Sequence, residues 1–71
     1  MFGENVRKYR VDKGLSQEKL GELSNLHRTY ISDIECFRRS ISLENVQRIA
    51  DALCIDTYLL FIFQKGDDKN G

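Results

Sequence analysis

Five polar side chains between residues 28 and 33 have the chemistry needed to contact nucleic acid. An arginine can donate two parallel hydrogen bonds to guanine, a threonine methyl can contact thymine, and a tyrosine hydroxyl can reach a phosphate. The candidates are Arg28, Thr29, Tyr30, Ser32 and Asp33. Ile31 and Ile34 are three residues apart in the same segment, and this spacing predicts a short helix with one apolar side and one polar side. The polar side is expected to face a DNA groove.

Three further side chains are candidates for contact with the DNA backbone. Gln17 opens an expected helix over residues 17–24, where its amide and the unpaired N–H groups of the first turn can hold a phosphate. Arg38 and Arg39 follow the 28–35 segment in an expected loop and place positive charge beside it. For Gln17, and for the polar side of the 28–35 helix, the alternative is an ordinary solvated surface position.

Two short helices joined by a tight turn must position these side chains. Ser16 is a good N-cap for residues 17–24, because its hydroxyl can accept from the first turn. His27 is the expected, though uncommon, N-cap of a helix over residues 28–35. Helix, break and second short helix make up the helix-turn-helix pattern, whose second helix enters the DNA major groove.

Three more helices are expected around this unit, which gives an all-α, five-helix fold. The first runs from about residue 2 to Lys13 and stops at Gly14. Another begins after Ser42 and has an apolar face made of Val46, Ile49, Ala50 and Leu53. Asp56 is expected to cap the last helix, over about residues 57–64.

The length of 71 residues allows one domain, expected over residues 1–64, with residues 65–71 as a disordered tail. A core this small favours association with a second copy. No apolar run approaches the roughly 20 residues of a membrane span, and the N-terminus lacks a secretory signal. Cys36 and Cys54 are interpreted as reduced thiols, so a cytoplasmic location is expected.

The net charge is zero, with 11 basic and 11 acidic residues, whereas nucleic-acid-binding domains commonly have a basic excess. The distribution is uneven, because residues 1–39 hold eight Lys/Arg against six Asp/Glu. A local basic patch matters more than net charge for contacts within a Debye length of about 10 Å.

Arg10 and Glu35 are a candidate structural salt bridge between the first helix and the end of the 28–35 helix. Their spacing alone leaves open the alternative of two exposed charges.

Six consecutive apolar residues over 58–63 would cover every side of a helix, although only one side can face the domain's own core. Leu60 and Phe63 are expected to face that core. The remaining side is expected to form a homodimer interface, and its candidates are Tyr58, Leu59, Phe61 and Ile62. The alternative is a short helix wedged entirely into the core.

The sequence has no set of residues typical of a catalytic site, and neither a cofactor nor a metal is expected. His27 is the one histidine and has no second ligand or nucleophile beside it. Cys36 follows Glu35, whose charge disfavours a reactive thiolate. There is also no glycine-rich phosphate loop.

The segment GLSQEKLGELSNLHRTYISDIE resembles the helix-turn-helix of the lambdoid phage repressor and Cro family, also called the XRE family. The string RTYIS, followed by a basic loop and ISLENVQRIADAL, is most similar to the controller proteins of restriction–modification systems. This resemblance implies a lambda-repressor-like domain in which the last helix forms the dimer interface. It also implies that Arg10 and Glu35 form an internal salt bridge between the first helix and the 28–35 helix. It also implies that Arg28 reads a base edge, and that Thr29 and Tyr30 meet the DNA near the operator centre.

The chain departs from the family pattern at His27, where Asp or Ser is usual, at Cys36, and at Asp33, which puts a carboxylate on the DNA side. The resemblance implies a homodimeric transcriptional regulator that binds double-stranded DNA with two-fold-related half-sites and acts on its own promoter, with RNA polymerase as a possible partner. The alternatives are a phage-type repressor or antitoxin, and a protein-interaction module without DNA binding. The neutral charge and Asp33 slightly favour the interaction module.

Overall fold

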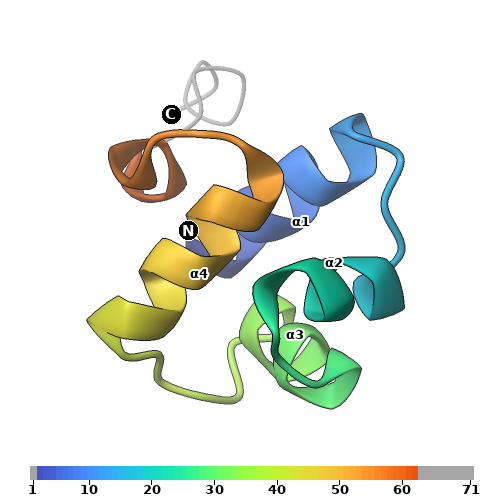
Figure 1. Cartoon of the computed structure of the whole chain (residues 1–71). Coiled ribbons are helices and arrows are strands. Elements are labelled where there is room, and N and C mark those ends of the chain that lie inside the picture. Colours follow the sequence, from blue (N-terminus) through green and yellow to red (C-terminus); the bar gives the residue numbers. More distant parts are fainter. Residues whose placement is uncertain (1, 63–71) are drawn as a thin grey trace, which may run out of the picture.

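The computed structural model describes residues 2–62, and this part of the chain is built from helices. The elements in chain order are α1 (Phe2–Asp12), α2 (Gln17–Ser24), α3 (Arg28–Glu35), α4 (Leu43–Leu53) and the 3₁₀ helix η1 (Thr57–Phe61). In Figure 1, α4 crosses in front of α1 and the α2–α3 pair lies beside them. The chain runs back from the end of α4 and places η1 against α1 and α4. The all-α class predicted from the sequence is confirmed. None of the helices within residues 2–62 is long and apolar enough to span a membrane.

The prediction of a fifth α-helix over residues 57–64 is wrong, because the chain forms a 3₁₀ helix of five residues there. Leu59 N–H donates to the Asp56 carbonyl, a three-residue step that is typical of a 3₁₀ turn. Asp56 makes no side-chain capping bond, and Leu60 is the one buried residue of this short segment. An uncapped turn with a single buried anchor has little to sustain a longer α-helix. Phe63 and the tail over residues 65–71 lie outside the described residues.

The helix ends follow the expected chemistry. Ser16 Oγ accepts from Lys19 N–H at 2.9 Å, and Ser42 Oγ accepts from Asn45 N–H at 3.2 Å. His27 caps α3, because its Nδ1 accepts from the Thr29 N–H at 3.0 Å. These bonds satisfy N–H groups that have no partner inside the helix.

The sharp turn between α2 and α3 requires a residue without a side chain at position 21. Asn25 adopts a left-handed conformation with φ 62°, and Leu26 N–H then donates back to the Gly21 carbonyl at 2.8 Å. A Cβ atom on Gly21 would lie 2.5 Å from the Leu26 carbonyl oxygen, which is backbone and cannot move aside. Gly21 therefore sets how closely the start of α3 can approach α2.

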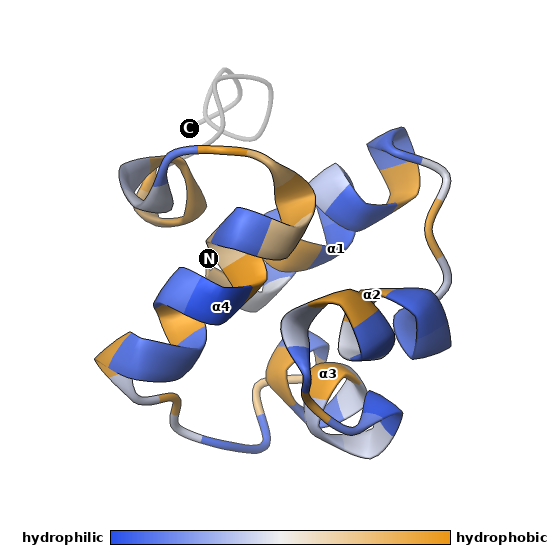
Figure 2. Ribbon diagram, viewed as in Figure 1, coloured by the Kyte–Doolittle hydropathy of each residue, from blue (hydrophilic) through white to orange (hydrophobic). Residues whose placement is uncertain are grey.

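One apolar core holds the helices together, and Figure 2 shows that every helix carries both hydrophilic and hydrophobic residues. All four residues of the predicted α4 face are buried, as is Leu60 of η1. The buried apolar residues are Val6, Leu20, Ile31, Ile34, Val46, Ile49, Ala50, Leu53 and Leu60. The inner side of α3 thus packs into the core, and the outer side of α3 faces solvent.

The Gly21→Ala variant is expected to lose about 1–3 kcal/mol of unfolding free energy, because the added methyl group would clash with backbone. Urea denaturation measures this loss. The neighbouring Glu22→Ala is the matched control, since Glu22 is exposed and its replacement should change stability by no more than about 0.5 kcal/mol. Equal stability of the two variants would contradict the close approach described for Gly21.

Candidate nucleic-acid interface

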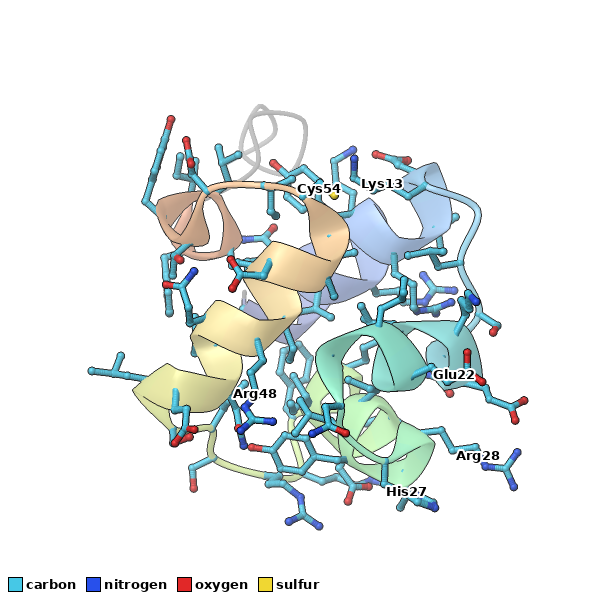
Figure 3. All side chains as sticks on the ribbon, viewed as in Figure 1. Lys13, Glu22, His27, Arg28, Arg48 and Cys54 are labelled. Carbon is cyan, nitrogen blue, oxygen red and sulfur yellow. The ribbon has the colours of Figure 1, made fainter. Side chains whose placement is uncertain are left out.

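The outer side of α3 brings the sequence-predicted contact residues together. Arg28 and Thr29 are exposed at its first turn, whereas Tyr30, Ser32 and Asp33 are half-buried farther along. The inner side contributes Ile31, Ile34 and Glu35 to the interior. In Figure 3, Arg28 and His27 project from the same end of α3, away from the body of the domain. The helix therefore packs its apolar side against the core and presents its polar side to solvent.

Asp33, the carboxylate expected to repel DNA, is paired inside the protein. Arg39 from the α3–α4 loop places Nη2 3.2 Å from Asp33 Oδ2. The guanidinium carbon of Arg39 also lies 4.9 Å from the centre of the Tyr30 ring, a cation–π contact. Asp33 therefore positions Arg39 over Tyr30, and its negative charge is largely offset.

The hydroxyl of Tyr30 is oriented by a residue that the sequence analysis missed. Asn45, near the start of α4, donates from Nδ2 to the Tyr30 hydroxyl oxygen at 2.9 Å. Because the oxygen accepts this bond, the hydroxyl hydrogen remains available as a donor. No sequence signal links residues 30 and 45, which meet only because α3 and α4 pack together.

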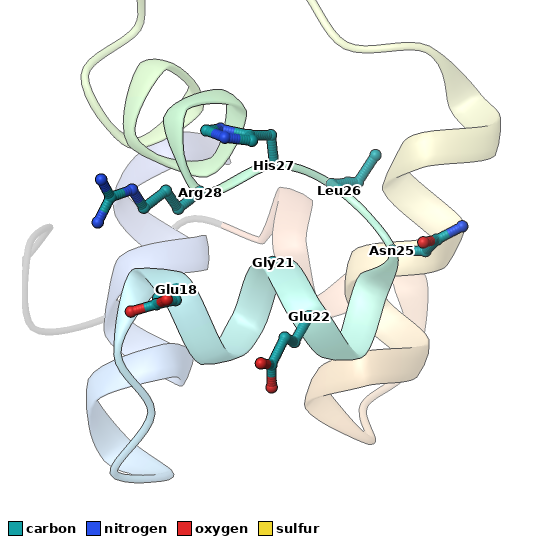
Figure 4. A pocket seen from close by; sticks show the side chains of 7 residues that line it. All are labelled: Glu18, Gly21, Glu22, Asn25, Leu26, His27 and Arg28. Carbon is teal, nitrogen blue, oxygen red and sulfur yellow. The ribbon is translucent and has the colours of Figure 1, made fainter.

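Arg28 and Arg38 are the arginines at this surface that make no ion pair within residues 2–62. Arg28 sits at the rim of a hollow of about 480 Å³ between α2 and the start of α3. Figure 4 shows Glu18 and Arg28 extending to the same side of α2, with Glu22 farther along the helix. Since neither carboxylate forms an ion pair with Arg28, its guanidinium is free to bind an outside acceptor.

A buried network fixes this surface to the rest of the domain. Glu35, whose side chain is 3% exposed, accepts from Arg10 Nε at 2.7 Å and from Arg10 Nη2 at 3.1 Å. Arg10 also donates from Nη1 to the Leu15 carbonyl at 2.8 Å. The pair suggested by the sequence is thus in bidentate contact and joins α1 to the end of α3.

Gln17 belongs to the same network, a role that the sequence analysis did not assign. Its Nε2 donates to Glu35 Oε1 at 3.0 Å, so the start of α2 is tied to the same carboxylate. An amide nitrogen carries two hydrogens, which leaves one for a phosphate at the start of α2. Position 17 opens α2 while Glu35 ends α3, and only their packing brings the two together.

A second surface lies on η1 and is called the C-terminal patch here. It consists of exposed Tyr58, Phe61 and Ile62 together with half-buried Leu59. Buried Asn5 of α1 donates to the carbonyls of Leu60 and Ile62, at 2.8 and 3.0 Å, and so holds this segment in place. Three of the four residues expected at a dimer interface are therefore exposed, and Leu59 is partly covered.

A two-helix unit with an outward polar helix and basic side chains beside it defines the helix-turn-helix class of DNA-binding proteins. The helix-turn-helix family model matches residues 6–60, and the chain belongs to that family. Several of its relatives are control proteins.

The control protein C.BamHI of Bacillus amyloliquefaciens is 52% identical over 54 residues, which is 75% of this chain and 67% of that protein. The crystal structure of the restriction–modification controller protein C.AhdI from Aeromonas hydrophila is 45% identical, with a TM-score of 0.84. That comparison covers 84% of this chain and 91% of the other. SinR, a master regulator of biofilm formation crystallised with DNA, is 25% identical with a TM-score of 0.82 over 87% of this chain and all of the other.

The Glu35→Gln variant is expected to lose about 3–5 kcal/mol of unfolding free energy, because Arg10 would be left as a buried charge without a counter-ion. Chemical denaturation followed by circular dichroism measures this loss. Glu44→Gln is the matched control, since Glu44 is 75% exposed in its pair with Arg48 and should cost less than about 1 kcal/mol. A Glu35→Gln protein as stable as this control would show that the network is dispensable.

Proposed function

We propose that this protein is the controller of a restriction–modification system and binds, as a homodimer, an operator in its own promoter. It is proposed to act as a regulator with no catalytic activity. The observation that carries the proposal is the polar side of α3, which has unpaired Arg28 at its first turn and the Tyr30–Arg39 contact farther along. Base reading requires such a donor on a helix that can enter the major groove.

The individual contacts are proposed by position. Arg28 reads a base edge, and Thr29 and Tyr30 meet the DNA near the operator centre. Ser32, Gln17, Arg38 and Arg39 hold the backbone or a base edge. Asp33 is assigned a positioning role, because its carboxylate is paired with Arg39 at 3.2 Å and is poorly placed to accept from a base.

The zero net charge is compatible with this function, because much of the acidic charge at this surface is paired inside the protein. Glu35 is buried against Arg10, and Asp33 faces Arg39. Arg28 and Arg38 remain as unpaired cations at the surface. Two modest half-sites also add their binding energies when the protein is a dimer, so strong binding does not require a strongly basic protomer.

The C-terminal patch is the proposed dimer contact. Two-fold association presents each exposed apolar residue twice and would place the two α3 helices about 34 Å apart, one turn of DNA. Binding at such a promoter can block RNA polymerase or recruit it, depending on which sites are occupied. RNA polymerase is thus a proposed partner in the regulation.

Arg28→Ala is expected to weaken operator binding by about 1–3 kcal/mol and to relax preference at one base pair of each half-site. Gel shifts on a fragment of the protein's own promoter, with a panel of single-base variants, measure both effects. Arg38→Ala should instead weaken binding to all of these sequences by a similar factor.

Arg7→Ala is the matched control, since Arg7 is exposed on α1 and outside the proposed interface. If Arg28→Ala binds and discriminates as the wild type does, α3 is not the base-reading helix.

Tyr58→Glu is expected to give a folded monomer with poor operator affinity, because Tyr58 is 61% exposed in the C-terminal patch and its charge would be buried at the interface. Analytical ultracentrifugation measures the oligomeric state. Val11→Glu is the control, because Val11 is 53% exposed on α1, near the opposite end from Phe2, and should leave the dimer intact. A wild-type chain that stays monomeric at tens of micromolar while binding its operator tightly would refute the proposed dimer.

A further inference from the structure

Phe37, in the loop directly after α3, is both exposed and conformationally unfavourable. Its φ of 62° lies in the left-handed region, where a bulky L-residue is rarely found. Its side chain is 61% exposed to solvent. Asn25 has the same φ, but its short polar side chain tolerates this conformation. The left-handed conformation closes the end of α3, because Phe37 N–H donates to the Ile34 carbonyl at 3.1 Å and Arg38 N–H donates to the Asp33 carbonyl at 2.8 Å. Glycine or asparagine would serve this turn at a lower conformational cost than phenylalanine.

The Phe37 ring lies over the start of α1. A Cβ atom built on Gly3 would be 3.1 Å from Phe37 Cε1, so the ring contacts the backbone at that position. The preceding residue, Phe2, has its ring centre 5.1 Å from that of Phe61 in the C-terminal patch. The start of α1 thus contacts Phe37 at Gly3 and the C-terminal patch at Phe2.

We propose that Phe37 belongs to the surface through which two copies of this chain associate. The proposal rests on the dimer contact proposed above and extends it from η1 to the end of α3. A second copy is the favoured occupant because Phe37 and the C-terminal patch both contact the start of α1, Phe37 at Gly3 and the patch at the adjacent Phe2. Burial against the partner protomer then offsets the unfavourable backbone conformation at position 37.

This arrangement would couple dimerisation to DNA binding. Phe37 is next to Arg38 and two residues from Arg39, which contacts Asp33 and Tyr30. A partner protomer that covers Phe37 would also fix the loop that carries both arginines. Dimerisation would therefore restrain the backbone of this loop, whose Arg39 side chain is already held by Asp33, as well as pair the two half-sites.

The test compares Phe37→Gly and Phe37→Asn with the wild type by analytical ultracentrifugation. Both replacements accept a positive φ and remove the ring. We expect the dimer dissociation constant to rise at least tenfold in both. In the monomeric Tyr58→Glu background, the thermal midpoint of Phe37→Gly should be equal to or higher than that of its parent, which separates lost association from lost folding.

Cys54→Gly is the matched control, because Cys54 is also exposed and has φ 59°. Cys54 is the C-cap of α4 and is not part of the surface proposed here. This variant should keep the wild-type dimer constant.

The proposal would be overturned if Phe37→Gly and Phe37→Asn had the same dimer dissociation constant as the wild type. If those variants also bind a single half-site duplex more weakly, the ring meets DNA instead of a second copy. A wild-type chain that is monomeric under the same conditions would refute the proposed dimer itself, and the role of Phe37 with it.

Discussion

The carboxylate of Glu35 is the constraint on which the rest of the structure depends. A charge that is 3% exposed must be paired, and it takes its partners from two other helices. Arg10 of α1 supplies two donors and Gln17 of α2 supplies a third. Because Glu35 is the last residue of α3, this network fixes the end of that helix against both neighbours. Among residues 2–62, no buried side-chain nitrogen or oxygen lacks a hydrogen-bond partner, so the interior tolerates this charge without leaving another polar group unpaired.

The outward polar side of α3 follows from this anchoring. The apolar side of α3 and its last residue are buried in the interior, so only the polar side is available to another molecule. On that side, the Asp33–Arg39 pair and the bond from Asn45 to Tyr30 hold two side chains in defined positions before any ligand binds. Interactions that are already formed in the free protein need not be ordered on binding, which lowers the entropic cost of association. Arg28 stays unpaired within residues 2–62 and is available for base contact.

Much of the fold could be predicted from local signals. The bounds of α2 and α3, the three capping residues and the buried face of α4 agree with the sequence analysis, because each depends on residues within one or two helical turns. The segment after Asp56 was predicted less well. Its apolar run indicated a helix, but the type and length of that helix depend on Leu60 reaching the core and on Asn5 binding the carbonyls of Leu60 and Ile62. Neither contact has a local signature.

The sequence by itself determined the helix-turn-helix unit, the polar side of α3, and the Arg10–Glu35 pair as a candidate. These depend on periodicity, capping chemistry and residue type, all of which are written along the chain. Only the tertiary structure decided that Gln17 shares the Glu35 carboxylate, that Asp33 pairs with Arg39, and that Asn45 orients Tyr30. Residues 17 and 35, or 30 and 45, are far apart in sequence and meet because packing of the apolar sides sets how the helices cross. The strength of a polar contact depends on that geometry to within a few tenths of an ångström, which spacing along a chain does not encode.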